Sequence, residues 1–422
     1  MNITALKGFK DILPDETPLW QRIEATARGL FQRYGYAEVK VPILEKTSLF
    51  LRSIGETTDI VEKEMYTFTD RNGEQVTLRP EGTASVLRAF IEHSLHASRP
   101  VQKLFTIGPM FRHERPQKGR LRQFHQMSLE VVGASEPLLD AEVLALAWHL
   151  LAALDLSVSL EINSLGCPAC RPGFNEALST FLAGHAGRIC EDCERRRHRN
   201  PLRTLDCKNE TCHGLYQDAP SILAHLCADC ASHFQIVQDG LSLVGIPHRV
   251  NPFMVRGLDY YSRTTFELVT NDLGAQSAVG AGGRYDGLVK QLGGPAMPGI
   301  GFAMGMERLV LLMQQKQAKA APLAPGLFIA ALGAAAQREA FRLVHALRQK
   351  GVCAAMDHGG KSLKSQMKQA DRLQLSHVLI LGDDELARGE ATMKAMATSQ
   401  QEPVRLPGDL DAWCGEMARR LP

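Results

Sequence analysis

The sequence lacks a large charge excess and a long apolar run, and it has few cysteines outside one short stretch. Its 48 lysines and arginines face 46 aspartates and glutamates, a formal net charge of +2, which excludes the strongly basic balance of proteins that coat nucleic acid. No apolar run approaches the roughly 20 residues of a membrane span, and the first residues carry no charged leader before an apolar stretch. We therefore expect a cytoplasmic protein without membrane contacts.

The length of the chain indicates more than one domain. Its 422 residues, 45% of them apolar, exceed what one hydrophobic core usually holds. Apolar residues at helical spacing predict a long helix over Leu19–Phe31 and a second over Leu139–Leu154. Tyr36–Leu44 is typical of a strand broken by Pro42, and proline within a strand favours an edge or an interface. Strands interleaved with flanking helices favour an α+β fold.

The last hundred or so residues have a separate pattern. Residues 313–325, rich in Gln, Lys, Ala and Pro, predict a linker, so a second domain should span 326–422. Its apolar periodicity predicts a βαβαβ order, with strands at 327–332, 352–356 and 377–381 and helices at 337–350 and 363–373. Lys361, Lys364 and Lys368 should share one helix face, which either contacts RNA or is merely solvated.

A basic segment runs from Gly108 to Gln126. A strand, a basic loop and a returning strand would place Arg112 on the sheet and the other cations, Arg115, Lys118, Arg120 and Arg122, on the loop. Arginine on a rigid strand suits bidentate capture of phosphate, and a basic loop suits a polyanion such as an RNA end. The alternative is an exposed hairpin whose charges are only solvated.

A glycine-rich segment, Gly299–Leu309, precedes a predicted helix that carries Arg308. Glycines let the backbone approach a nucleotide closely, and the arginine can lie across a base or reach a γ-phosphate. Taken alone, the same glycines could serve tight packing of a strand on a helix.

Together, in this order, the basic and glycine-rich segments resemble motifs 2 and 3 of class II aminoacyl-tRNA synthetases. Val41-Pro42 resembles motif 1, whose proline lies at a dimer interface. Arg79–Thr83, Val255–Tyr261 and Ala281–Leu288 resemble signatures of the histidyl-tRNA synthetase family. The resemblance implies a homodimer with an antiparallel catalytic sheet and flanking helices (1–166 and 241–312), an insertion (167–240) and a C-terminal α/β anticodon-binding domain (326–422).

The implied reaction is ATP-dependent activation of L-histidine to histidyl-adenylate, with release of pyrophosphate, and transfer to the 3′ end of tRNA(His). ATP is a substrate, and Mg²⁺ is expected on its β- and γ-phosphates. The alternative is a paralogue that senses histidine as a regulatory subunit of histidine biosynthesis. Such a paralogue would have lost an ATP-binding arginine and the C-terminal domain, whereas this chain has both.

The resemblance also implies roles for individual residues. The histidine-binding set is Glu81, Gly82, Thr83, Gln126, Glu130, Tyr260 and Tyr261. Within it, Glu81, Thr83 and Gln126 would hold the α-ammonium, while Glu130 and Tyr261 would read the imidazole, which offers one donor and one acceptor. The alternatives are two tyrosines packed on opposite faces of a strand and a buried salt bridge at Glu130.

By the same resemblance, ATP would be bound by Arg112, Arg256 and Arg308. Of these, Arg112 and Arg256 would be catalytic because they grip the α-phosphate. Arg115 and Gln117, on the basic loop, would read the extra 5′ guanine of the tRNA.

Eight of the ten cysteines lie between Cys167 and Cys230, in four pairs with metal-ligand spacing. They predict one or two structural zinc sites, the most compact set being Cys190, Cys193, Cys207 and Cys212. The family resemblance implies no metal there, and the alternative is ordinary buried thiols. The basic run Arg195–Arg199 in the same stretch is typical of a solvated helix.

Overall fold

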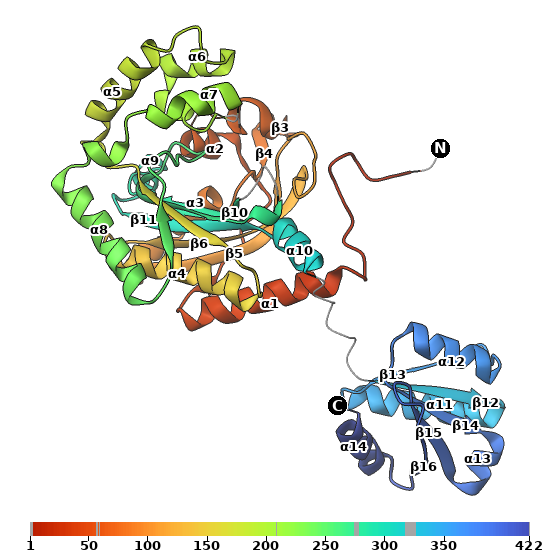
Figure 1. The fold of residues 1–422 in the computed structure, drawn as a ribbon. Coiled ribbons are helices and arrows are strands. Elements are labelled where there is room, and N and C mark those ends of the chain that lie inside the picture. Colours follow the sequence, from red (N-terminus) through yellow and green to blue (C-terminus); the bar gives the residue numbers. More distant parts are fainter. Residues whose placement is uncertain are drawn as a thin grey trace. The chain divides into compact units, whose positions relative to one another are not determined.

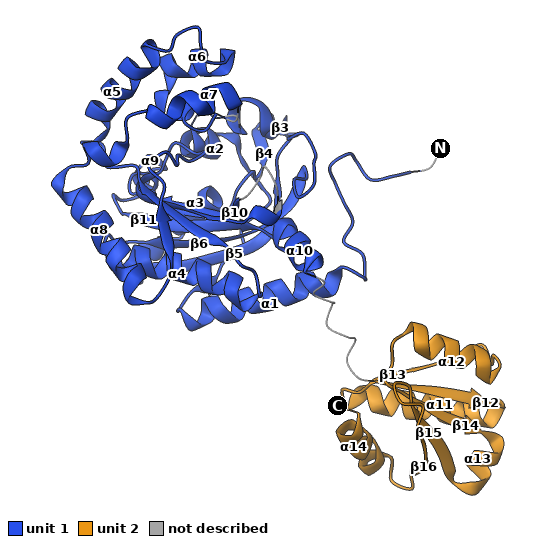
Figure 2. Cartoon of the chain, in the orientation of Figure 1, with its two compact units in different colours: residues 1–318 blue, residues 319–422 orange. Residues whose placement is uncertain are grey.

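The computed structural model describes residues 3–55, 58, 60–207, 209–273, 278–316 and 326–421. The chain divides into two compact units, residues 1–318 and 319–422 (Figures 1 and 2). The expected linker falls mostly outside the described residues, and its first residues instead end a helix, α10 (Met306–Gln315). None of the described helices combines the length and apolar character needed to cross a membrane.

The first unit is built on an eight-stranded sheet in the order β1-β5-β6-β11-β10-β9-β7-β8. All neighbouring pairs are antiparallel except β1–β5 and β7–β8, so the predicted α+β fold with an antiparallel sheet is confirmed. The strands are β1 (Ala37–Glu38), β5 (Gln102–Phe111), β6 (Gln123–Val132), β7 (Ser159–Ser164), β8 (His248–Val250), β9 (Ser262–Val269), β10 (Ala278–Arg284) and β11 (Gly299–Gly305).

Long helices cover one face of this sheet (Figure 1): α1 (Thr17–Arg33), α4 (Pro137–Ala153), α8 (Ala228–Leu243) and α10. Both predicted helices are confirmed. The apolar residues of α1 form a single stripe, whereas α4 is apolar all round because it packs against the sheet, α1 and α8. At the α4–α8 contact a Cβ on Gly240 would lie 2.9 Å from Cβ of Ala141, so a glycine allows the close approach.

On the other face, a small sheet in the order β2-β4-β3 lies with α2 and α3. Its elements are β2 (Leu44–Lys46), α2 (Thr47–Ile54), β3 (Tyr66–Thr69), β4 (Gln75–Leu78), α3 (Thr83–Glu92) and, nearby, α9 (Leu288–Gln291).

The strand predicted over Tyr36–Leu44 is broken as expected, but its two parts belong to different sheets: the chain passes here from β1, at the edge of the large sheet, to β2 of the small one. Pro42 has no N–H to continue a ladder. Instead, the buried Arg79 guanidinium donates to the carbonyl oxygens of Val41 at 2.8 Å and Pro42 at 3.3 Å, and its Nε donates to Pro109 at 2.8 Å. Arg79 thereby fixes the crossing between the sheets.

The cysteine-rich stretch forms a helical layer with its own small core, which includes Phe174, Leu178, Leu182 and the thiols of Cys193 and Cys212. Its helices are α5 (Arg171–Ala183), α6 (Glu191–Arg199) and α7 (Glu210–Leu215). The basic run is helical as expected, and ion pairs to Asp192 and Glu194 on α6 partly neutralise it.

The second unit is a five-stranded sheet in the order β13-β12-β14-β15-β16, in which β12, β13 and β14 are parallel. The predicted βαβαβ elements are confirmed as β12 (Gly326–Leu332), α11 (Ala334–Gln349), β13 (Cys353–Met356), α12 (Leu363–Arg372) and β14 (His377–Gly382). Four further elements follow: α13 (Asp383–Arg388), β15 (Glu390–Ala395), β16 (Gln401–Arg405) and α14 (Leu410–Arg420).

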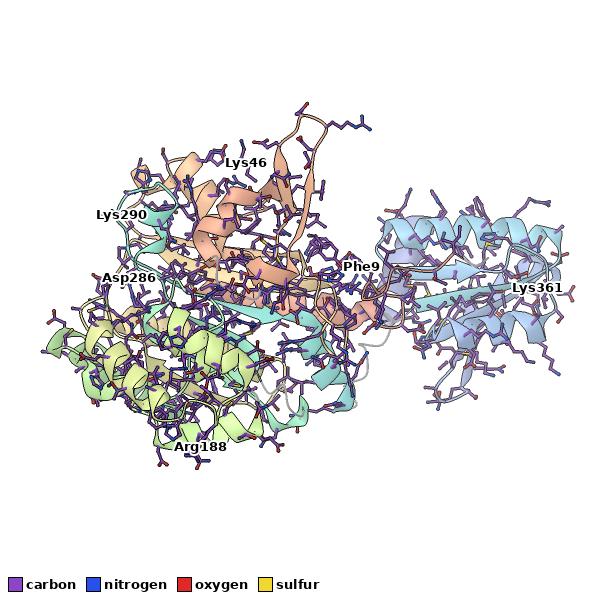
Figure 3. All side chains as sticks on the ribbon, turned by 90° about the horizontal axis from the view of Figure 1, so that it is seen from above. Phe9, Lys46, Arg188, Asp286, Lys290 and Lys361 are labelled. Carbon is purple, nitrogen blue, oxygen red and sulfur yellow. The ribbon has the colours of Figure 1, made fainter. Side chains whose placement is uncertain are left out.

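The prediction that three lysines share a face of α12 was wrong for Lys361, which precedes the helix and whose Nζ lies 3.7 Å from Asp357 (Figure 3). The side chain of Asp357 accepts the backbone N–H of Lys361 at 2.9 Å, which holds the lysine in the preceding turn. Lys364 and Lys368 remain on the helix and line a shallow pocket together with Lys394.

A fully buried ion pair joins the end of β10 to α4. The Arg284 guanidinium lies 2.5 Å from Asp140 Oδ1 and donates to the Ala134 carbonyl at 2.6 Å, and both charged side chains are 0% exposed. His233 of α8 lies 3.2 Å from the other Asp140 oxygen. Although Arg284 belongs to a family signature, its contacts are structural.

Asp140→Asn should therefore destabilise the first unit by about 3 kcal/mol, because it removes the fully buried counter-charge of the guanidinium and leaves only the partly exposed Asp286, 3.0 Å from its Nε. The change should appear as a lower midpoint of thermal unfolding. Asp155→Asn is the matched control, since the Asp155 side chain is 85% exposed and its loss should cost no more than about 0.5 kcal/mol. Equal midpoints for the two variants would contradict the structural role of the pair.

Candidate active site

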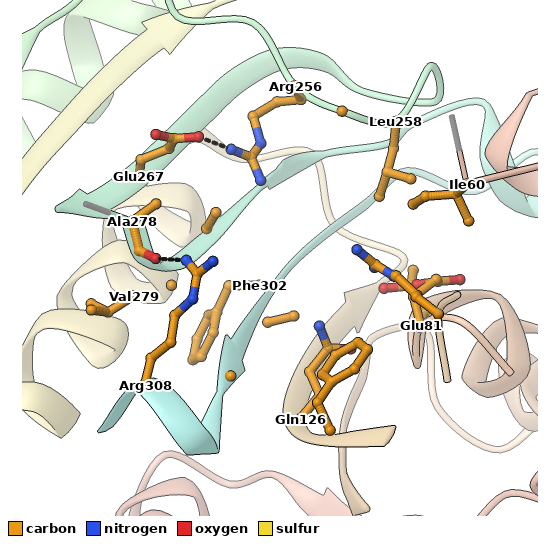
Figure 4. Close-up of a pocket in the computed structure, with 18 of the residues that line it drawn as sticks. Ile60, Glu81, Gln126, Arg256, Leu258, Glu267, Ala278, Val279, Phe302 and Arg308 are labelled. Carbon is orange, nitrogen blue, oxygen red and sulfur yellow. Dashed lines mark hydrogen bonds and ion pairs between the residues drawn. The ribbon is translucent and has the colours of Figure 1, made fainter. Parts of the chain in front are cut away.

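A cavity of about 290 Å³ opens in the first unit, over β6, β10 and β11 (Figure 4). Ile60 and five further segments of the chain supply its wall. They bring together eight of the residues singled out in the sequence: Glu81, Thr83, Arg112, Gln126, Arg256, Tyr260, Tyr261 and Arg308. Most of the residues that the resemblance assigned to histidine and ATP therefore share one site.

Three arginines converge on this cavity. Arg112 directly follows β5, and its Nε donates to the Pro80 carbonyl at 2.8 Å while the guanidinium lies 5.4 Å from the Phe124 ring centroid. Arg256 forms an ion pair with a glutamate of β9, and Arg308, in the first turn of α10, donates to a backbone carbonyl of β10; both point into the cavity in Figure 4. Converging cations suit a polyphosphate.

Burial lowers the pKa of Arg308, with neighbouring Arg120 as the next cause. The partner of Arg256 is Glu267, which sequence reasoning missed. Glu267 lies in an ordinary β-strand pattern, so the sequence gives no sign of its role. Its pairing with Arg256 becomes visible only in the structure, where β9 lies opposite the loop that carries the arginine. Its carboxylate holds the arginine in place, and the guanidinium lies 5.7 Å from the Tyr261 ring centroid.

The Glu81 carboxylate sits at the start of α3. Its two oxygens accept the backbone N–H groups of Thr83 and Ala84, both at 2.8 Å, and the residue is 4% exposed. Burial raises the pKa of Glu81, while these bonds and the charge of Arg112 act in the opposite direction. Gly82 does not line the cavity; a Cβ there would lie 2.7 Å from the Ser128 hydroxyl, so glycine allows the close approach of this turn to β6.

Glu130 of β6 lies behind the cavity wall and is 1% exposed. It accepts hydrogen bonds from the Thr83 hydroxyl at 2.7 Å and the Tyr285 hydroxyl at 2.5 Å, and burial raises its pKa to about 8. On the neighbouring strand a Cβ at Gly301 would lie 2.2 Å from its carboxylate, so only glycine leaves room. Since its partners in the described structure are hydroxyls, the buried salt bridge considered from the sequence is not what holds it.

Three tyrosines form the aromatic end of the cavity. The ring centroids of Tyr260 and Tyr261 lie 4.6 Å apart, and Tyr285 meets Tyr260 edge-on at 5.9 Å. Burial raises the pKa of all three phenols, which keeps them protonated. The alternative of two tyrosines on opposite faces of a strand is wrong, because both line the same cavity. Tyr285 was missed, although it stands within the Ala281–Leu288 signature.

Arg115 and Gln117 lie outside the cavity, exposed on the loop between β5 and β6. The loop ends in a tight turn in which Gln117 and Arg120 exchange backbone hydrogen bonds at 3.1 and 2.8 Å, with Gly119 at φ +75°. Arg120 turns back to the cavity wall and pairs with Glu114 at 2.9 Å. The loop therefore presents one basic surface inward and another to solvent.

The eight paired cysteines gather into two sets, each with four sulfur atoms within 4.8 Å of one another. One is the expected set of Cys190, Cys193, Cys207 and Cys212; the other is Cys167, Cys170, Cys227 and Cys230. All eight are free thiols, and either set could hold a metal ion.

The antiparallel sheet, with its cavity of converging arginines and its separate α/β unit, defines a class II aminoacyl-tRNA synthetase. The family model described as histidyl-tRNA synthetase matches residues 8–168 and 200–309, and an anticodon binding domain model matches 327–407. The chain belongs to the histidyl-tRNA synthetase family.

Individual relatives agree with this assignment. The chain is 59% identical to the histidine–tRNA ligase of Geobacter metallireducens, covering 96% of this chain and 97% of that one. It is 56% identical to the ligase of Desulfotalea psychrophila, over 98% and 96% of the two chains. Among solved structures, apo histidyl-tRNA synthetase of S. aureus matches with a TM-score of 0.82 at 36% identity, covering 98% and 99%.

The buried Glu130 predicts a pH dependence of stability. Because its pKa is raised from 4.5 to about 8, the folded state holds a proton that the unfolded chain releases, and this contribution is lost as pH rises toward and through 8. Glu130→Gln, which mimics the neutral carboxyl, should therefore gain in thermal stability relative to the unaltered protein as pH rises from about 6 to 8.5, without histidine present.

Glu92→Gln is the control, because Glu92 lies on α3 with its side chain 59% exposed. Its difference from the unaltered protein should not change over the same pH range. A flat difference for Glu130→Gln as well would mean that Glu130 is already ionised at neutral pH.

Proposed function

We propose that this chain activates L-histidine with ATP and transfers it to tRNA(His). The observation that carries the proposal is a single cavity with arginines at one end and a carboxylate-and-tyrosine pocket at the other. The histidine carboxylate attacks the α-phosphate of ATP, pyrophosphate leaves, and histidyl-adenylate forms. In the second step the terminal ribose hydroxyl of the tRNA attacks the activated carbonyl and AMP leaves.

The arginine end acts mainly by neutralising charge and fixing geometry, since the first step needs little proton transfer. Arg112 and Arg256 grip the α-phosphate from two sides, each held by its own contacts, and Arg308 reaches the adenine and the γ-phosphate. Mg²⁺ would supply further positive charge at the phosphates. The carboxylates of Glu114 and Glu307 on the cavity wall offer the oxygen ligands that this ion prefers.

The other end binds histidine. Glu81, Thr83 and Gln126 replace the water around the α-ammonium, which binds poorly without oxygen acceptors. The imidazole N–H donates to the Glu130 carboxylate, which already accepts the hydroxyls of Thr83 and Tyr285. The Tyr261 hydroxyl donates to the second ring nitrogen. An amino acid without both a donor and an acceptor would leave buried polar groups unpaired, which is the basis of strong discrimination.

The tRNA contacts two parts of the chain. Arg115 and Gln117 read the extra 5′ guanine from the solvent side of their loop. The second unit binds the anticodon arm, where Lys364, Lys368 and Lys394 around one shallow pocket supply cations for phosphates. The exposed Ile43 and Leu44, beside Pro42, support a homodimer interface at this face. The enzyme works in the cytoplasm.

A structural zinc ion at Cys190, Cys193, Cys207 and Cys212 belongs to the same proposal. The sulfurs of Cys190 and Cys207 lie 3.7 Å apart, close to the roughly 3.8 Å edge of a tetrahedron with Zn–S bonds of about 2.3 Å. The set lies inside the small core of the cysteine-rich layer, which the ion would hold together.

A histidine-sensing regulatory subunit is disfavoured by two observations. All three arginines proposed to bind ATP converge on one cavity, and the second unit matches an anticodon-binding model. A sensor of histidine alone would need neither.

Arg256→His should lower histidine-dependent ATP–pyrophosphate exchange by at least about a hundredfold and abolish charging of total tRNA, because it removes a cation held against the α-phosphate. Histidine binding, followed by calorimetry, should remain measurable. Arg33→His is the control, since Arg33 is exposed in the last turn of α1 and lies outside the cavity. Exchange within about tenfold of the unaltered enzyme would remove Arg256 from the mechanism.

Arg115→Ala should separate the two steps. Because Arg115 is exposed and outside the cavity, pyrophosphate exchange should stay within about twofold while tRNA charging falls by about tenfold or more. Arg71→Ala, at the exposed turn between β3 and β4, should leave both steps unchanged. If exchange and charging fell equally in Arg115→Ala, the arginine would serve the structure of the loop rather than recognition of RNA.

A further inference from the structure

The second cysteine set, Cys167, Cys170, Cys227 and Cys230, lies at the neck of the insertion. Cys167 and Cys170 follow β7, where the chain enters the cysteine-rich layer, and Cys227 and Cys230 open α8, where the chain returns to pack on α4. Sixty residues separate the first cysteine of the one pair from the first of the other. The set therefore joins the two connecting segments through which the chain enters and leaves the cysteine-rich layer.

The arrangement of the sulfurs fits a tetrahedral metal site. Cys167 Sγ lies 3.7 Å from Cys170 Sγ and 3.9 Å from Cys227 Sγ, and all four sulfurs lie within 4.8 Å of one another. Zinc bound by four thiolates at about 2.3 Å places neighbouring sulfurs roughly 3.8 Å apart, whereas a disulfide needs about 2.05 Å. The spacing matches shared coordination.

The backbone around the set suits thiolates. Cys170 and Cys227 are the N-cap residues of α5 and α8, where helix N–H groups favour negative charge. The Cys227 N–H itself donates to Cys170 Sγ at 3.2 Å. The turn before the set requires glycine, because Gly166 has φ +63° and a Cβ there would lie 2.6 Å from Cys170 Cβ.

The same neck is bonded to the aromatic end of the cavity. Arg171, the residue after Cys170, donates from its guanidinium to the backbone carbonyl of Tyr261. Two residues after Tyr261, the Arg263 N–H donates to the Gly166 carbonyl at 2.9 Å. The Leu165 N–H donates to the Arg263 carbonyl at 2.7 Å. The position of Tyr261 thus depends on the turn that carries Cys167 and Cys170.

We infer that Cys167, Cys170, Cys227 and Cys230 bind a second zinc ion that closes the neck of the insertion and, through Arg171, positions Tyr261 in the histidine pocket. The metal is structural and takes no part in the reaction. Arg171 is a positioning residue, since it acts on the ligand only through Tyr261. The metal site stands independently of the proposed function, whereas the effect on histidine binding rests on it.

Zinc content tests the site directly. The full chain, purified without chelator or added metal, should contain about two zinc ions per chain by mass spectrometry. Cys167→Ser/Cys227→Ser should contain about one, Cys190→Ser/Cys207→Ser about one, and Cys353→Ser, which alters the exposed cysteine of the second unit, still about two.

Two zinc ions retained in Cys167→Ser/Cys227→Ser would overturn the neck site, as would a single ion in the unaltered chain that is lost from Cys190→Ser/Cys207→Ser. Cobalt(II) titration of the metal-free full chain avoids reliance on variants that fold poorly. The absorption of tetrahedral cobalt thiolate should saturate at about two equivalents, and saturation at one would overturn the second site.

Arg171→Met tests the coupling. In pyrophosphate exchange its KM for histidine should rise about tenfold, while KM for ATP and kcat stay within about twofold and zinc content is unchanged. Arg188→Met, on the exposed surface of the same layer (Figure 3), should match the unaltered enzyme. An unchanged KM for histidine would overturn the coupling. Loss of exchange with every amino acid in the unaltered enzyme would instead overturn the proposed function and leave the metal site standing.

Discussion

Burial of the Glu130 carboxylate is the constraint on which the histidine end of the site depends. A carboxyl group in the middle of a sheet must receive hydrogen bonds, and here the donors are hydroxyls at the start of α3 and just beyond β10. A glycine on the adjoining strand leaves room for it. Three separate segments, Arg79–Thr83, Ala281–Leu288 and Gly299–Leu309, therefore meet at this one group.

The remainder of the cavity is organised by charge. A chain with a net charge of only +2 gathers arginines at one end of a single cavity and places buried carboxylates at the other, so the polarity of the site is local. Each arginine is held by a carbonyl, a carboxylate or a ring before any substrate arrives, and such preorganisation is what charge stabilisation requires. The cysteine-rich layer also contributes to this preorganisation, because its neck is hydrogen-bonded to the residues at the start of β9, next to Tyr261.

The sequence predicted those features that depend on strong periodicity or on family signatures. The apolar stripe of α1, the wholly apolar α4 and the βαβαβ order of the second unit are encoded by local sequence patterns. The convergence of the signature residues was predicted from the family resemblance instead. The break at Pro42 was predicted but the change of sheet was not, because that change depends on Arg79, which is 38 residues from Val41 along the chain. β15 and β16 were missed because their sequences are polar, and Glu267 and Tyr285 because their partners are distant in sequence. The grouping of the cysteines into two sets likewise required the fold.

The most direct measurement of the central claim is ATP–pyrophosphate exchange with each standard amino acid in turn, followed by charging of total tRNA with any amino acid that supports exchange. The account predicts exchange with histidine alone, because its flat imidazole ring offers one N–H donor and one bare nitrogen acceptor to the pocket of Glu130 and Tyr261, and predicts charging with histidine thereafter. Exchange with a different amino acid, or binding of histidine without any exchange, would contradict it.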